Sequence, residues 1–174
     1  LVNIFTPCEP LHAMGAHPLC AEGFSSYLTG GYSEQCFLEY AEQRGVPETF
    51  CSYHKTMIGA AESGVLPRPR LMITTSTVCD ANISSFRRIA QHFKLREFVI
   101  DVPHRDSADA ASYVAGQLMK MTEYMEDSLH RKLDPERFAR AVGNTNESLA
   151  FYRRFLDALE TRNFPTSVSL QMFN

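Results

Sequence analysis

The sequence lacks the features of a membrane protein and of a nucleic-acid-binding protein. No apolar stretch approaches the roughly 20 residues that a membrane-spanning helix needs, and the first residues do not show the charged and then apolar segments of an export signal. Only 4 of the 17 basic residues are lysine, and the formal net charge is −3. This charge balance gives no basic surface for nucleic acid or anionic lipid. The sequence therefore predicts a soluble, cytoplasmic protein.

Several common catalytic and nucleotide-binding motifs are also absent. No Gly-x-Gly-x-x-Gly follows a strand pattern and no Gly-x-x-x-x-Gly-Lys-Ser/Thr occurs, which argues against dinucleotide and P-loop nucleotide binding. The Gly-x-Ser-x-Gly elbow of hydrolases is missing as well. The five cysteines have no paired short spacings, so they do not predict a disulfide framework. Metal or thiol chemistry in a reducing compartment is the better interpretation.

Two cysteines stand out because each follows an extended segment and precedes a helical pattern. Residues 71–77 are rich in β-branched residues and uncharged, which predicts a buried strand, and the residues from Asp80 onward have helical periodicity. Cys79 lies at this corner, and Cys51 precedes a predicted helix over residues 56–63. A helix N-terminus favours a thiolate, so both are candidate nucleophiles or metal ligands.

The remaining pattern alternates strands and helices. It predicts strands over residues 1–5, 18–21, 71–77 and 97–102, a flexible loop over 23–31, and helices over 9–16, 33–44, 56–63, 84–94, 107–131 and 134–162. This order favours an α/β fold, a parallel sheet with helices on both faces, followed by a long C-terminal helical pair.

The apolar residues of the last predicted helix form a seam that predicts packing on a partner helix or a second domain. The chain opens on an apolar run without an initiator methionine and stops at the start of another element. We therefore expect residues 1–131 to form an α/β domain that carries Cys51 and Cys79, and residues 132–174 to form a long helix that leads to a second domain absent from this sequence.

Three stretches of the sequence resemble one known family. Residues 6–18 are similar to the Pro-x-Glu and Ala-x-Gly-Ala-x-Pro opening of the 2-hydroxyacyl-CoA dehydratase and benzoyl-CoA reductase family, which includes the 2-hydroxyglutaryl-CoA dehydratase D-component. Residues 51–55 and 74–80 resemble its two cysteine motifs. The strand after them and the helical stretch with Asn144 and Asn146 match the family's order of elements.

The resemblance implies a fold and a cofactor. Members have two flavodoxin-like domains, and a [4Fe-4S] cluster lies between them, held by three cysteines. Two of these would be Cys51 and Cys79, and the third would come from the second domain. Cys8, Cys20 and Cys36 lie outside the two cysteine motifs, so the resemblance assigns them no ligand role.

The resemblance also implies an activity. A dehydratase of this family removes water from a 2-hydroxyacyl-CoA through a ketyl radical, after one-electron reduction by an ATP-hydrolysing iron-sulfur activator, and it works with a second dehydratase subunit as a heterodimer. Within the family the sequence also suits a benzoyl-CoA reductase-type subunit, a double-cubane-cluster reductase subunit or an electron-relay subunit. From another class, it suits a flavodoxin-like binding module without metal.

Three polar residues are candidates for the substrate side of this site. Glu9 follows the first predicted strand, and Ser25 and Ser26 follow the second, so in a parallel sheet all three reach the same carboxyl-end cleft as the two cysteines. Glu9 is a candidate base for the β-proton, and a serine hydroxyl is a candidate donor to a bound water. The competing interpretation of Glu9 is a first-turn acid favoured by the helix dipole.

Overall fold

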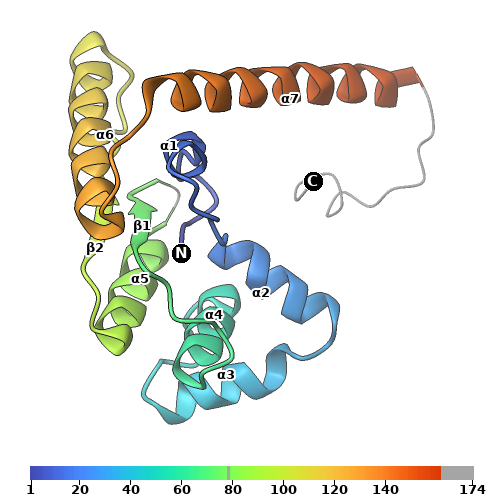
Figure 1. Cartoon of the computed structure of the whole chain (residues 1–174). Helices are drawn as coiled ribbons and strands as arrows, with labels where there is room; N and C mark the ends of the chain where they lie inside the picture. The colour runs from blue at the N-terminus through green and yellow to red at the C-terminus, as the bar shows by residue number, and fades with distance from the viewer. Residues whose placement is uncertain (78, 162–174) are drawn as a thin grey trace.

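A small parallel sheet lies at the centre of the computed structural model, which describes residues 1–77 and 79–161 (Figure 1). Strand β1 (Met72–Thr75) pairs with β2 (Glu97–Ile100), with Met72 opposite Glu97 and Thr75 opposite Ile100. Val2 extends the sheet through parallel bridges to Ile73 and Cys20. All four β1 residues are buried, and none of them is charged. This composition suits a strand whose two faces are both covered by helices.

Helices cover both faces of this sheet. On one face, helices α4 (Ser52–Glu62) and α5 (Asp80–Phe93) pack on Met72 through apolar side chains that include Phe86 and Ile89. On the other face, α1 (Glu9–Ala13) and α6 (Ala108–Leu129) pack on Ile73 and Ile100. Successive strand residues point to opposite faces, so a continuous apolar strand needs a helix layer on each side.

Two further helices surround α4. Helix α2 (Ala21–Gly30) and helix α3 (Glu34–Gln43) both pack against it. Helix α3 approaches so closely that a Cβ atom on Gly59 of α4 would overlap the backbone carbonyl of Phe37. The absence of a side chain at residue 59 therefore permits this contact.

The last helix, α7 (Pro135–Thr161), begins at the N-cap predicted from the sequence. The Asp134 carboxylate accepts hydrogen bonds from the backbone N–H of Glu136 at 2.9 Å and of Arg137 at 3.2 Å. Figure 1 shows α7 crossing α1 and then projecting away from the sheet. Its predicted seam is largely exposed, with Leu149 at 50% and Leu156 at 41%.

The structure corrects three of the sequence-based expectations. Residues 23–31 are not a flexible loop, because most of them belong to α2, and residues 18–21 contribute only the bridge at Cys20. Helix α7 packs on α1, so the two long C-terminal helices are present but do not form the expected pair. A parallel sheet with helices on both faces is confirmed, while the flavodoxin-like topology stays a prediction. In the described residues, no helix is both long and apolar enough to cross a membrane.

Candidate functional site

Cys51 and Cys79 occupy equivalent positions at the starts of two adjacent helices. Cys51 is the N-cap of α4 and Cys79 is the N-cap of α5, and these two helices pack against each other. Both cysteines are exposed, and neither sulfur forms a capping hydrogen bond with its own helix. Two free sulfurs therefore lie where backbone N–H groups and helix dipoles favour negative charge.

His54 connects the two helix starts. It lies in the first turn of α4, three residues after Cys51, and its Nε2 atom is 3.8 Å from the Sγ atom of Cys79 on α5. The side chain is buried against the edge of Phe50, and burial lowers the pKa of the imidazole. Its Nδ1 atom has no hydrogen-bond partner among the described residues. The sequence analysis missed His54, although its spacing of one helical turn from Cys51 was visible.

Lys55 fixes the segment that leads into Cys51. Its side chain is buried, its ammonium pairs with the Glu42 carboxylate of α3, and it donates a hydrogen bond to the carbonyl oxygen of Glu48 at 2.8 Å. Glu48 lies in the loop that precedes Cys51. The lysine of the first cysteine motif therefore has a structural role that the sequence alone did not assign.

Ser25 and Ser26 join α2 to the first turn of α4. The Ser25 hydroxyl is buried and donates to the backbone carbonyl of Tyr53 at 2.9 Å. The Ser26 hydroxyl lies 3.1 Å from the Tyr53 hydroxyl and 3.1 Å from the carbonyl oxygen of Glu22. Both serines thus contact the first turn of the helix that Cys51 begins, and they do so from a helix rather than from the expected loop.

One carboxyl group follows each of the two extended segments that pair at Val2 and Cys20. Glu9 is half-buried at the first position of α1. Glu22 lies in the first turn of α2, where its Oε2 accepts a hydrogen bond from the backbone N–H of Ile4 at 3.1 Å. Its Oε1 is buried without a partner among the described residues, and burial raises the pKa of this carboxyl. Glu22 has the environment of a functional carboxyl, and the sequence analysis did not select it.

Near Cys79, the hydroxyls of Thr75 and Ser76 form hydrogen bonds at the carboxyl end of the sheet. Thr75 accepts a hydrogen bond from Asn3 at 3.0 Å, and the Ser76 hydroxyl contacts Asp101 and the backbone of Val102. The buried Thr74 hydroxyl has no partner within the described residues. These contacts fix the carboxyl end of β1 and leave Thr74 as an unpaired polar group near it.

The other three cysteines lie in different environments. Burial raises the pKa of the Cys8 thiol to about 11 and also raises the pKa of Cys20. Cys36 is exposed on α3, where its Sγ lies 3.2 Å from the carbonyl oxygen of Ser33. Within residues 1–77 and 79–161, no group of three His, Cys, Asp or Glu side chains is arranged to hold a metal ion.

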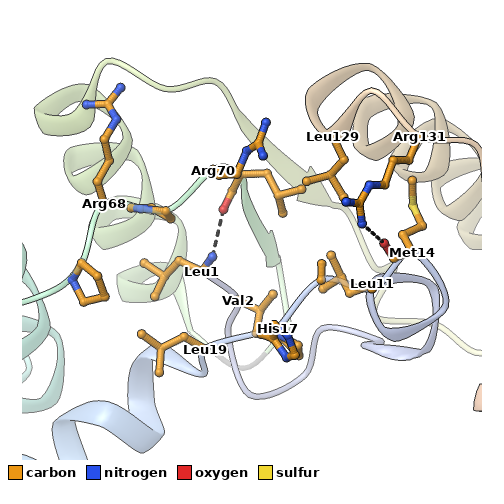
Figure 2. Close-up of a pocket in the computed structure, with 16 residues that line it drawn as sticks. Leu1, Val2, Leu11, Met14, His17, Leu19, Arg68, Arg70, Leu129 and Arg131 are labelled. Atoms are coloured by element: carbon orange, nitrogen blue, oxygen red, sulfur yellow. Dashed lines mark hydrogen bonds between the residues drawn. The ribbon is translucent and has the colours of Figure 1, made fainter.

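A cavity of about 390 Å³ lies at the opposite ends of the strands. Figure 2 shows Leu1, Leu11 and Leu129 around it, with Arg131 donating to the carbonyl oxygen of Met14 at 3.2 Å. Arg68 and Arg70 also line it, but their guanidinium groups point away from Leu1 in this view. None of the site residues predicted from the sequence lines this cavity.

The fold and the site together define an α/β domain with two exposed cysteines at neighbouring helix starts. The family model of the 2-hydroxyglutaryl-CoA dehydratase D-component matches residues 3–174, and the chain belongs to this family. The resemblance inferred from the sequence motifs is therefore confirmed.

Two curated relatives match nearly the whole chain at low identity. The alpha subunit of (R)-phenyllactyl-CoA dehydratase from Clostridium sporogenes is 22% identical over 177 residues, which cover 97% of this chain and 43% of that protein. Subunit alpha of lactoyl-CoA dehydratase from Anaerotignum propionicum is 24% identical over 191 residues, which cover 97% of this chain and 45% of that protein. The chain thus spans less than half the length of these two relatives.

Proposed function

We propose that this chain is part of a 2-hydroxyacyl-CoA dehydratase, and that Cys51 and Cys79 are ligands of a [4Fe-4S] cluster in it. The observation that carries the proposal is the placement of both sulfurs at the starts of the packed helices α4 and α5. The family membership and the two dehydratase alpha subunits among the relatives support the reaction class.

The residues present fit such a cluster. Iron-sulfur clusters in proteins are held by cysteine thiolates, and both sulfurs are exposed and free of capping bonds. A third cysteine would come from a second domain, to which residues 132–174 would connect the α/β domain of residues 1–131. Burial raises the pKa of the half-buried Cys8 and Cys20 thiols, which disfavours the thiolate form that binds iron.

The reaction explains why such a protein needs an electron carrier. Water leaves a 2-hydroxyacyl-CoA as the α-hydroxyl and a β-proton, and that proton is too weakly acidic for ordinary base catalysis. When bound, the cluster would supply one-electron chemistry to the thioester. In a one-electron-reduced substrate, hydroxide would leave first and the β-proton would then become acidic enough for a side-chain base.

The residues of this chain would handle the proton and the leaving group. We propose that the base is one of the two carboxyls that follow the extended segments around Val2 and Cys20, Glu9 or Glu22. The unpaired oxygen and the raised pKa of Glu22 favour Glu22, because a base with a raised pKa takes a proton more readily. Ser26, with Tyr53, offers hydroxyls that would orient the leaving water, while Ser25 holds the two helices together.

The proposed partners follow from the same reaction. The substrate would be an acyl-CoA, the electron would come from an ATP-hydrolysing iron-sulfur activator, and a second dehydratase subunit would complete a heterodimer. The alpha-subunit names of the two relatives support a partner subunit.

Iron and acid-labile sulfide analysis of the natural full-length polypeptide, purified without oxygen, tests the proposal. We expect about four iron and about four sulfide per polypeptide. Protein without iron would point to a metal-free flavodoxin-like module instead. Turnover assays with the activator then separate the reaction classes, since consumption of benzoyl-CoA but not of 2-hydroxyacyl-CoA would indicate a reductase.

A further inference from the structure

We propose that His54 is a positioning residue for Cys79, and that its Nε2–H group donates a hydrogen bond to the Cys79 sulfur when that sulfur is an iron ligand. This inference rests on the proposed function. It concerns a residue other than the two proposed ligands. It is based on the distance of 3.8 Å between the Nε2 atom of His54 and the Sγ atom of Cys79.

The imidazole is held in a fixed place. His54 is 5% exposed, its ring contacts the edge of Phe50, and its backbone belongs to the first turn of α4. Because Cys51 begins α4 and Cys79 begins α5, His54 is the side chain through which one helix start contacts the sulfur of the other. His54 therefore links the start of α4, where Cys51 lies, to the sulfur of Cys79 on α5.

The surroundings of the two ring nitrogens determine which of them carries the hydrogen. A neutral imidazole has one N–H group, and an iron-bound thiolate has no hydrogen to donate. Placing the hydrogen on Nε2 gives it the sulfur as an acceptor. The only unpaired group is then the lone pair of Nδ1, which has no partner among the described residues. Placing it on Nδ1 would leave a buried donor unpaired and aim a lone pair at the sulfur.

Two consequences follow for a bound cluster. Partners behind a metal ligand fix its orientation, so loss of the imidazole should weaken retention of the cluster through Cys79. Hydrogen bonds to the sulfurs of a cluster stabilise its reduced form, so their loss makes the reduction potential more negative. A residue with a packing role alone would change neither property in a way that depends on an N–H group.

The test compares His54→Leu with His54→Gln in the natural full-length polypeptide purified without oxygen. Leucine fills the space without a donor, whereas the glutamine amide can place an N–H group close to the Nε2 position. His92→Leu is the matched control, because His92 is an exposed histidine on α5, the helix that Cys79 begins. Iron content and the midpoint potential, followed by electron paramagnetic resonance, are measured for each protein.

We expect His54→Leu to lose iron or to show a more negative midpoint potential, His54→Gln to resemble the wild type, and His92→Leu to change neither value. Equal iron content and equal potential in wild type and His54→Leu would overturn the role of His54 while leaving the proposed function intact. Equal losses in the leucine and glutamine variants would reduce His54 to packing and overturn it too. A wild-type protein without a cluster would instead refute the proposed function, and the role of His54 with it.

Discussion

The backbone N–H of Lys55 donates a hydrogen bond to the carbonyl oxygen of Cys51 at 2.9 Å, while its side-chain ammonium binds the carbonyl oxygen of Glu48 at 2.8 Å. One residue therefore holds the chain on the helix side of Cys51 and in the loop before it. The ion pair with Glu42 adds a link to α3. The backbone around Cys51 is thus held by a residue four positions away.

We expect Lys55→Met to lower the free energy of unfolding by about 1–3 kcal/mol, because the Glu48 carbonyl and the Glu42 carboxylate lose a charged donor. Lys132→Met is the control. Its ammonium also pairs with a carboxylate, that of Glu126, but it is 87% exposed, so its loss should leave the free energy of unfolding nearly unchanged. Urea denaturation measures the free energy of unfolding of both variants. Equal decreases would show that the buried contacts of Lys55 stabilise the protein no more than an exposed ion pair does.

A second prediction concerns which cysteines the cluster needs. We expect Cys51→Ala and Cys79→Ala to abolish cluster retention in the full-length protein, while Cys20→Ala and Cys36→Ala keep it. The reason is placement, since the first pair lies at helix starts without capping bonds and Cys20 instead caps α2 by accepting from the backbone of Gly23 at 3.4 Å. Unchanged iron in the Cys79→Ala variant would contradict the ligand assignment.

The sequence predicted the parts of this site that depend on local pattern. An uncharged β-branched run became β1, and helical spacing after it became α5, so Cys79 was correctly placed at the corner between them. The same reasoning placed Cys51 before α4. The positions of both cysteines follow from the burial of a strand and of one helix face, and this burial is visible in the sequence as a pattern of apolar residues.

The sequence failed where contacts between distant residues decide the outcome. The Gly and Ser residues after Ala21 favour a loop, but α2 forms because the Cys20 sulfur caps it and Ser25 is buried on α4. Its hydroxyl-bearing residues also bond back to the preceding turn, as Thr29 does to Ser25 at 3.0 Å. The contact of His54 with Cys79 joins residues 25 apart in the sequence, so no local pattern reveals it.

A third prediction tests the close packing that positions α4. Gly59→Ala should destabilise the protein by about 3 kcal/mol, because the added methyl group meets the backbone of Phe37, which cannot move aside as a side chain can. Gly143→Ala is the control, since beyond the backbone of its own helix no atom of the described residues lies within 4 Å of a Cβ there, and it should stabilise α7 by up to about 1 kcal/mol. Thermal unfolding compares them, and a tolerated Gly59→Ala would mean that α3 and α4 are farther apart.

A fourth prediction separates the two candidate bases. Glu22→Gln keeps the shape of the side chain and most of its hydrogen bonding but removes proton transfer. We therefore expect turnover of a 2-hydroxyacyl-CoA to fall by about 10²–10⁴-fold while the iron content stays the same. Glu9→Gln should stay within a factor of about three of the wild type, as suits an acid in the first turn of α1. The reverse result would assign the base to Glu9 and leave Glu22 with a structural role.

The pH dependence of turnover is an independent test of whether Glu22 or Glu9 is the base. Burial raises the pKa of Glu22 above that of an ordinary glutamate, and a base is active only when deprotonated. Wild-type turnover should therefore decline as the pH falls through this raised pKa, at a higher pH than an ordinary carboxyl would allow. The Glu22→Gln variant should lose this acidic limb, and Glu9→Gln should retain it. An acidic limb that persists in Glu22→Gln would show that another group takes the proton.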